Sequence, residues 1–257
     1  MGGNGSADEV WQKVLVDGHR SLLVMQKVMR LLPSSPRCKM CHNPFAGIGG
    51  RLVGLAGFKQ SRKNPNLCTK CCESLPRGGA EVDIAVLFAD IRGSTALGER
   101  QSATDFAGVM NRFYKVATDV LVRHDAVIDK LIGDEVMALF IPGIAGPGYR
   151  RRAVDAAVAL LRATGVGSAD GPWLEVAASV NAGTAYVGNV GDAVVDFTAL
   201  GDPVNVAARL QSLAAAGEVL VAEDVDPSVA AAFPTAARRV LDLRGHEERV
   251  AALAVRP

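Results

Sequence analysis

Two aspartates stand where carboxylates can bind a metal ion. Asp90 follows residues 82–89, an apolar run typical of a buried strand, and Asp134 lies in the turn between predicted strands over residues 126–132 and 135–141. If these strands are neighbours, both carboxylates project from one edge of a sheet and repel each other unless a divalent cation joins them. Such oxygen ligands favour Mg²⁺ or Mn²⁺ over Zn²⁺.

Further polar side chains occur at two predicted helix starts. Gly93, Ser94 and Thr95 follow Asp90 and open a short helix, whose free N–H groups can bind a phosphate. Asn205 and Arg209 are four residues apart on a predicted helix over residues 203–212, so they share one face. Burying that face is costly unless an anionic group meets it, and a solvent-facing Arg is the alternative interpretation.

Five cysteines lie within residues 38–72, and four of them form two C-x-x-C pairs. The pairs are Cys38 with Cys41 and Cys68 with Cys71. Four thiolates in this arrangement predict a tetrahedral Zn²⁺ site, with an iron–sulfur cluster as the alternative. Zinc would make the segment a rigid scaffold, whereas a cluster would make it a redox or gas sensor. Cys72 is then a spare thiol or a competing ligand.

Composition limits the classes of protein that the chain can be. Its 257 residues are 49% hydrophobic and 21% charged, which suits a folded protein with a sizeable core. The net charge of +1 predicts no nucleic-acid partner. Yet residues 11–79 carry twelve basic and two acidic side chains, so this segment can dock on an acidic domain or on another anionic surface.

Hydrophobic periodicity predicts an α+β protein. Residues 7–32 have the pattern of one amphipathic helix, residues 37–75 are Gly-rich with Phe45, Gly47, Gly49 and Gly50 as turn residues, and residues 76–79 form a linker. The remainder predicts helices over residues 94–99, 102–123, 149–164 and 203–212, and strands over residues 82–89, 126–132, 135–141, 174–181, 237–243 and 249–255. This order indicates a ferredoxin-like βαββαβ sheet with helices on one face.

Three segments together resemble the catalytic domain of the class III nucleotide cyclases, of the bacterial type. They are residues 88–95 (FADIRGST), residues 130–134 (KLIGD) and residues 201–209 (GDPVNVAAR). Their order and spacing fit this family from about residue 80 to the C-terminus. The chain is therefore expected to comprise an N-terminal helix and linker over residues 1–36, a Cys-rich module over residues 37–76 and a cyclase domain over residues 80–257.

The resemblance implies a role for each motif residue. Asp90 and Asp134, with the Ile91 carbonyl, match the ligands of two Mg²⁺ or Mn²⁺ ions, which activate the ribose 3′-oxygen and hold the leaving pyrophosphate. Arg209 matches the arginine that offsets charge on the α-phosphate, and Asn205 matches the residue that orients the ribose.

The same resemblance places the base-reading pair at Lys130 and Thr198. Lys130 is donor-only and can meet adenine N1, while the Thr198 hydroxyl can accept from the exocyclic amine, so ATP is favoured over GTP. Asp196 is near but out of register and receives no role. Many animal enzymes have Asp where this chain has Thr198, which leaves selectivity looser. Arg244 is a candidate for gripping the triphosphate.

The family's sites take their metal aspartates and their Asn/Arg helix from opposite subunits, which implies a head-to-tail homodimer. The expected protein is thus an adenylate cyclase, a phosphorus–oxygen lyase that converts ATP to 3′,5′-cyclic AMP and pyrophosphate under control of the Cys-rich module. The alternatives are a guanylate or pyrimidine nucleotide cyclase, or an inactive cyclase-like nucleotide-binding protein. With no signal pattern and no membrane-spanning stretch, a cytoplasmic location is expected.

Overall fold

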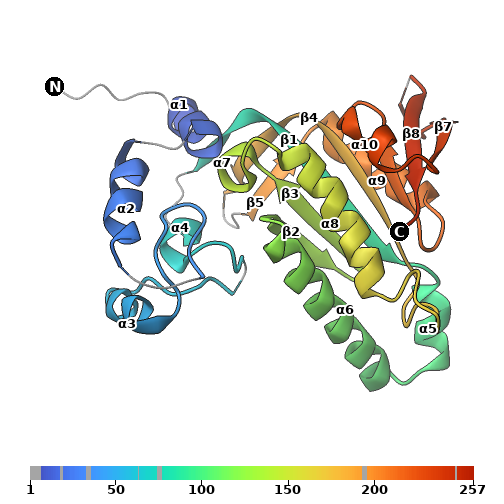
Figure 1. Ribbon diagram of the computed structural model, residues 1–257, viewed down its shortest axis with the longest axis horizontal. Coiled ribbons are helices and arrows are strands. Elements are labelled where there is room, and N and C mark those ends of the chain that lie inside the picture. Colours follow the sequence, from blue (N-terminus) through green and yellow to red (C-terminus); the bar gives the residue numbers. More distant parts are fainter. Residues whose placement is uncertain are drawn as a thin grey trace.

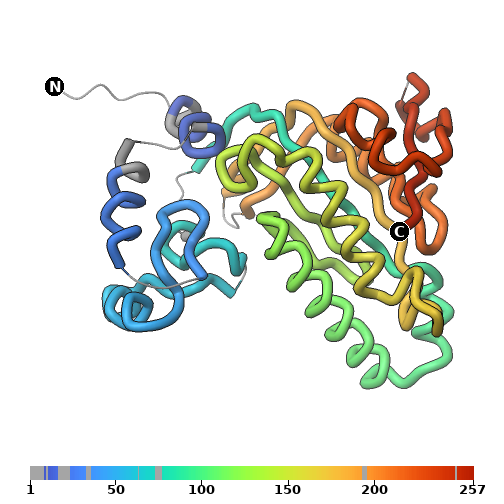
Figure 2. Tube along the Cα trace, viewed as in Figure 1, coloured from blue at the N-terminus to red at the C-terminus, as the bar shows by residue number. Residues whose placement is uncertain are grey.

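The computed structural model describes residues 7–17, 20–32, 36–62, 64–73, 77–192, 196–246 and 248–257. A large sheet with long helices forms one part of the molecule, and the four N-terminal helices and the Cys-rich loops lie together at one end of it (Figure 1). We call the four N-terminal helices and the Cys-rich loops together the N-terminal module. Figure 2 shows the path of the chain from this module into the long strands of the sheet.

The sheet has eight strands in the order β2-β3-β1-β4-β6-β8-β7, with β5 paired to β4. The bounds are β1 (Gly78–Ile91), β2 (Val127–Ile132), β3 (Glu135–Phe140), β4 (Val176–Val190), β5 (Asp196–Leu200), β6 (Val219–Ala222), β7 (Ala237–Leu241) and β8 (Val250–Val255). All pairings are antiparallel except β4 with β6. The central β1 is buried on both sides, which explains its nearly unbroken apolar sequence.

Helices cover both faces of this sheet. On one face, α8 (Tyr149–Ala163) packs on alternate residues of β1 such as Leu87, and α6 (Ala103–Arg123) packs beside it on β2 and β3. Helix α9 (Asp202–Leu213) covers the opposite face, which includes Val86. On that face the Ser179 hydroxyl of β4 donates to the Ala207 carbonyl of α9 at 2.7 Å. The short helices are α5 (Ser94–Arg100), α7 (Pro142–Ala145) and α10 (Ser228–Ala232). The predicted α+β fold class is confirmed, but helices occupy both faces rather than one.

The predicted linker over residues 76–79 is partly wrong. Gly78 and Gly79 begin β1 and pair with Asn189 and Gly188 of β4. A Cβ on Gly79 would lie 2.4 Å from the Val187 carbonyl oxygen, so glycine here permits the close approach of two backbones rather than a flexible link.

The predicted single helix over residues 7–32 is also wrong. The chain forms α1 (Ala7–Gln12), a π-helical turn (Lys13–Asp17) and α2 (Arg20–Arg30). Trp11 is 1% exposed and its ring stacks on Phe197 of β5 at a centroid distance of 6.2 Å. A Cβ on Gly143 of α7 would meet the Leu15 carbonyl oxygen at 2.5 Å. Helix α1 and the π-helical turn therefore pack against β5 and α7.

The glycines of the Cys-rich segment were expected in turns, but most lie in α3 (Gly47–Leu55). Gly49 is buried, and a Cβ on Gly50 would lie 2.6 Å from the Phe45 carbonyl carbon. Small residues are needed here because the helix packs directly on the preceding chain. The second cysteine pair lies at α4 (Thr69–Glu73).

Two buried asparagines join the Cys-rich segment to the sheet. Asn66 donates to the carbonyls of Val122 (3.2 Å) and Ala126 (2.7 Å), and the Asn64 side-chain oxygen accepts from the Ile128 N–H at 2.8 Å. Strand β2 is at the edge of the sheet, so Asn64 covers an otherwise free backbone donor.

No helix in the described part of the chain is both long and apolar enough to cross a bilayer. The domain boundaries remain predictions, and residue 76, the predicted end of the Cys-rich module, lies outside the described residues.

Replacing Trp11 with alanine tests the docking of the N-terminal helix. We expect Trp11→Ala to lower the free energy of unfolding by about 3–5 kcal/mol, because a fully buried aromatic ring is lost. Urea denaturation of the full chain measures this. Leu31→Ala is the control, since Leu31 is 84% exposed and its loss should change stability by at most about 0.5 kcal/mol. Equal effects of the two substitutions would contradict the docked arrangement.

Candidate functional site

Asp90 and Asp134 meet at one edge of the sheet, as the sequence predicts. Strands β1 and β3 pair antiparallel with Asp90 opposite Glu135, and the Ile91 N–H donates to the Asp134 carbonyl at 3.3 Å. The hydroxyl of Tyr114 on α6 donates to the Gly133 carbonyl and so holds the turn that carries Asp134. The pair is therefore fixed by backbone register together with one tyrosine.

The electrostatics of this pair suit a cation. Burial is the main reason that the pKa of Asp90 is raised to about 6, and the neighbouring Asp134 carboxylate is the second. Burial and the same two carboxylates also raise the pKa of Glu135. The Asp90 Oδ1 atom is buried with no hydrogen-bond partner among the described residues. Three neighbouring acids with an orphaned oxygen fit a divalent cation, which would supply the missing positive charge.

Gly93 directly follows this edge and has a left-handed backbone with φ of 73°. It precedes α5, whose first residues are Ser94 and Thr95, and no side chain caps this helix start. The predicted phosphate-facing segment therefore begins three residues after Asp90.

Helix α9 presents different residues on its two sides. Gln211 is buried and lies beside Asp90, where its amide and Arg92 act to lower the carboxyl pKa. Arg209 points elsewhere: its guanidinium lies 3.5 Å from where a Cβ of Gly245 would be, at the turn between β7 and β8 that also carries the exposed Arg244. Arg209 and Gln211 are two positions apart, which on an α-helix is a rotation of about 200°. The two side chains therefore lie on opposite sides of α9, and Arg209 does not face the carboxylate beside Gln211.

The exposed Asn205 and the half-buried Arg209 thus form a group separate from the aspartates of their own chain. Within the described residues, no hydrogen bond or ion pair connects either of them with Asp90 or Asp134.

The predicted base-reading pair does come together. Lys130 Nζ lies 3.1 Å from Thr198 Oγ1, although the two residues are on different strands, β2 and β5. The same ammonium contacts Asp196 at 2.7 Å and Asp129 at 3.4 Å. Partial burial lowers the pKa of Lys130, but the carboxylates of Asp196 and Asp129 outweigh it, so the pKa is raised overall.

Sequence reasoning missed several contributors. Asp129 is fully buried and accepts from the Thr198 hydroxyl at 2.8 Å, which fixes the direction of that hydroxyl, and burial raises the pKa of the Asp129 carboxyl. Asp196 was set aside as out of register, yet it contacts Lys130 directly. The available signal in the sequence was that Asp196 precedes Phe197 in a short stretch where polar and apolar residues alternate, which places Asp196 and Thr198 on the same face of a strand. Gln211 and Tyr114 carried no signal in the sequence.

The four predicted cysteine ligands also converge. The sulfur atoms of Cys38, Cys41, Cys68 and Cys71 all lie within 4.8 Å of one another, and Cys72 is outside this group. The Cys41 and Cys68 sulfurs are 3.7 Å apart, close to the edge of a tetrahedron with metal–sulfur bonds of about 2.3 Å. A [4Fe–4S] cluster binds each thiolate through a different iron, and a [2Fe–2S] cluster binds the thiolates as two pairs on separate irons, so in neither are all four sulfurs this close together. The spacing therefore fits one tetrahedral ion.

Backbone groups around the sulfurs favour thiolates. The Cys68 N–H donates to the Cys38 sulfur at 3.3 Å, and the Cys71 N–H donates to the Cys68 sulfur at 3.4 Å. Hydrogen bonds from the other thiols, Cys41 first, lower the pKa of Cys38, and the crowding of thiols raises the pKa of Cys71. A bound cation removes this conflict by accepting all four as thiolates.

Comparison with known proteins places this arrangement in a family. Residues 80–253 match the family described as "Adenylate and Guanylate cyclase catalytic domain". Uncharacterized protein Rv1319c of Mycobacterium tuberculosis is 34% identical over 177 residues, which cover 66% of this chain and 32% of the relative. The chain thus spans about a third of the length of the curated relatives it matches.

Solved structures agree with the sheet described above. The guanylyl cyclase Cya2 is 26% identical with a TM-score of 0.59, covering 69% of this chain and 93% of that one. The adenylyl cyclase CyaB from P. aeruginosa is 27% identical with a TM-score of 0.58, covering 69% and 95%. Since the family match covers most of the chain and the fold agrees, the chain belongs to the class III nucleotide cyclases, the adenylate and guanylate cyclase catalytic domain family.

Proposed function

We propose that the protein is an adenylate cyclase that converts ATP to 3′,5′-cyclic AMP and pyrophosphate in a homodimer with two shared sites. The observation that carries the choice of ATP is the 3.1 Å contact between Lys130 and Thr198. A lysine donates to adenine N1, and a threonine hydroxyl is able to accept from the exocyclic amine.

Asp90 and Asp134 are the proposed ligands of two Mg²⁺ or Mn²⁺ ions, with the Ile91 carbonyl as a further ligand. When bound, such ions favour deprotonation of the ribose 3′-hydroxyl and hold charge on the pyrophosphate leaving group. The chain's own contribution is to keep the carboxylates together by strand register and by the Tyr114 hydrogen bond. The N–H groups of Gly93, Ser94 and Thr95 are proposed to face the phosphates.

Arg209 is proposed to offset charge on the α-phosphate and Asn205 to orient the ribose, with Arg244 near the triphosphate. Because Arg209 and Gln211 lie on opposite sides of α9, Arg209 faces away from the Asp90 of its own chain. This supports a head-to-tail dimer in which Asn205 and Arg209 serve the aspartates of the second chain.

Guanylate cyclase is the second candidate, because Asp196 supports it. Guanine carries donors at N1 and at its amino group, and a carboxylate 2.7 Å from Lys130 is an acceptor for such donors. The Asp196 carboxylate, rather than Lys130, would then read the base.

We also propose that the Cys-rich module holds one Zn²⁺ through Cys38, Cys41, Cys68 and Cys71 and regulates the cyclase domain. The 3.7 Å sulfur spacing supports a single ion. The bond between Asn64 and Ile128 of β2, and that between Asn66 and Ala126 just before β2, connect the module with the sheet.

Turnover measurements with each nucleoside triphosphate test the function. With Mn²⁺ present, we expect ATP to be converted at least tenfold faster than GTP, and Asp134→Ala to abolish turnover. Arg209→Ala should lower kcat by about 10²–10³, the usual effect of losing a donor that stabilises transition-state charge. Faster turnover of GTP would favour the guanylate candidate, and unchanged turnover in Asp134→Ala would indicate an inactive nucleotide-binding domain.

A mixing experiment tests the shared sites. Asp134→Ala should be inactive alone and Arg209→Ala should keep about 1% of wild-type activity or less, whereas a 1:1 mixture should recover about a quarter of it, because half of the dimers are mixed and each has one intact site. Mixing Asp134→Ala with Asp90→Ala is the control and should recover nothing, since both changes damage the same side. Recovery in both mixtures, or in neither, would contradict the arrangement.

Metal analysis tests the cysteine site. The purified protein should contain one Zn²⁺ per chain and be colourless, and Cys68→Ala should lose the ion and melt at a lower temperature. Cys72→Ala is the matched control and should keep the metal, because Cys72 lies outside the group of four sulfurs. A brown protein containing iron would show that zinc is the wrong assignment.

A further inference from the structure

Strand β2 contains a bulge that decides to which face of the sheet Lys130 points. Ile128 of β2 is opposite Ala138 of β3. The next residue of β3 toward its start, Met137, is opposite Lys130, so Asp129 is an extra residue in β2. Ile128 and Ala138 lie in the core under α6 and α8, whereas Met137 lies in the core on the opposite face. Regular alternation would place Lys130 on the face of Ile128, and the bulge turns it to the other.

The bulge brings two consecutive side chains to Thr198. The Thr198 hydroxyl donates to Asp129 Oδ2 at 2.8 Å, and Lys130 Nζ lies 3.1 Å from Thr198 Oγ1. Neighbouring side chains of a regular strand point to opposite faces, so the two contacts together require the irregular register. The geometry of the proposed base-reading pair therefore depends on how the bulge is held.

Asn64 of the N-terminal module contacts β2 directly before the bulge. Its side-chain oxygen accepts from the Ile128 N–H at 2.8 Å, and Asn64 is only 4% exposed. Strand β2 is at the edge of the sheet, so no further strand of the described chain covers its outer side. An edge strand that nothing holds from outside can shift its register by one residue, which would turn each of its side chains to the other face. Asn64 is placed to prevent this shift.

The loop that carries Asn64 is itself held by short hydrogen bonds. The Asn64 N–H donates to Ser61 Oγ at 3.2 Å, and the Asn64 carbonyl accepts from the Leu67 N–H at 2.9 Å. The Ser61 N–H donates to the Leu67 carbonyl at 2.9 Å, which closes the loop. The next residue, Cys68, belongs to the group of four clustered cysteines. The position of Asn64 is therefore fixed by the same segment that leads to the cysteine cluster.

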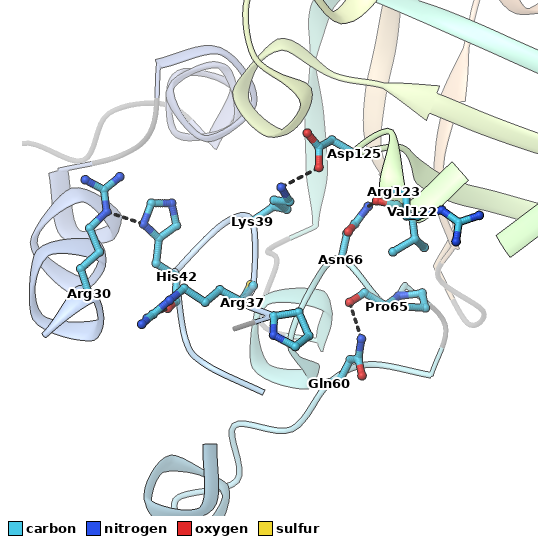
Figure 3. Close-up of a pocket in the computed structure, with 12 residues that line it drawn as sticks. Arg30, Arg37, Lys39, His42, Gln60, Pro65, Asn66, Val122, Arg123 and Asp125 are labelled. Atoms are coloured by element: carbon cyan, nitrogen blue, oxygen red, sulfur yellow. Dashed lines mark hydrogen bonds and ion pairs between the residues drawn. The ribbon is translucent and has the colours of Figure 1, made fainter. Parts of the chain in front are cut away.

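The other polar contacts of this region hold the module farther from the bulge. Figure 3 shows Lys39 directed to Asp125 and Asn66 directed to the end of α6. Lys39 pairs with Asp125 at 2.6 Å, and Asn66 donates to two carbonyls, one in the last turn of α6 and one just before β2. All these partners precede β2 in the chain. These contacts dock the module, whereas the Asn64 bond acts on the strand itself.

We propose that Asn64 is a positioning residue for selection of the base. Its bond to the N–H before the bulge holds the register that directs Asp129 and Lys130 to Thr198. The N-terminal module thereby contributes to substrate selection. This inference rests on the role proposed above for Lys130 and Thr198. Without the bond, ATP loses the donor for adenine N1, whereas GTP, which does not use that donor, loses less.

The ratio of kcat/KM for ATP to kcat/KM for GTP, measured on the full chain with Mn²⁺, tests this inference. Asn64→Leu removes the acceptor while keeping a side chain of similar shape. We expect the ratio to fall by about tenfold, chiefly through a higher KM for ATP, because a polar site discriminates only while its groups are aligned. Asn64→Asp keeps an acceptor oxygen at the same place and should retain the wild-type ratio.

Asn66→Leu is the matched control. Asn66 is also buried and lies in the same loop, but its hydrogen bonds in the described structure are to carbonyls that precede the bulge. We expect Asn66→Leu to lower the Tm at least as much as Asn64→Leu does, with an unchanged ratio of ATP to GTP use. A general loosening of the module would instead change the ratio equally in both variants. If Asn64→Leu does not fold, Asn64→Ala replaces it with the same expected result.

Displacement of a fluorescent nucleotide analogue by ATP and by GTP measures the same preference without turnover. The inference is overturned if Asn64→Leu keeps the wild-type preference, if Asn66→Leu loses it equally, or if Asn64→Asp loses it as well.

Failure of the proposed function shows separately, in the wild type. A wild-type preference for GTP refutes the choice of ATP, and the inference then requires Asn64→Leu to weaken that preference, since Lys130 also contacts Asp196 at 2.7 Å. A wild type that does not distinguish the two nucleotides overturns the inference together with the choice of ATP.

Discussion

The repulsion between two neighbouring carboxylates, Asp90 and Asp134, is the constraint on which the rest of the catalytic domain depends. Antiparallel pairing of β1 with β3 fixes the separation of the two residues, and Tyr114 fixes the turn between β2 and β3. Burial prevents water from relieving the repulsion, as the raised pKa of Asp90 indicates. The sheet edge is thus stable in its ionised form chiefly when a cation is bound, which couples the order of this edge to metal binding.

Helix α9 explains why a single chain holds all the motif residues and yet does not gather them. Gln211 takes the place beside Asp90, and Arg209 is directed to the β7–β8 turn. No change of side-chain rotamer carries a group from one side of a helix to the other. Arg92 already lies near Asp90 in the same chain, but the Arg209 guanidinium does not reach it, so helical geometry supports the proposed dimer alongside family resemblance.

Much of the fold could be predicted from the sequence, and what could not be predicted has definite physical causes. The long helices and the strands flanking Asp134 have strong periodicity, and the four cysteines have a specific spacing. By contrast, β5 is five residues long, and only its pairing with β4 brings Asp196 and Thr198 to Lys130. The glycines of α3 and β1 indicated turns and a linker, but tertiary contacts required them for close packing instead.

The N-terminal module contacts the domain at two places with different consequences. Asn64 and Asn66 bind the edge strand and the end of α6, while Trp11 packs on Phe197. Phe197 lies between Asp196 and Thr198, and alternate residues of a strand point to opposite faces, so Trp11 supports the strand from behind the proposed base-reading side chains. A displacement of the module would therefore release β5 and disturb Thr198 before it reached the carboxylates. The regulation proposed for this module should accordingly act on substrate binding first and on metal binding second.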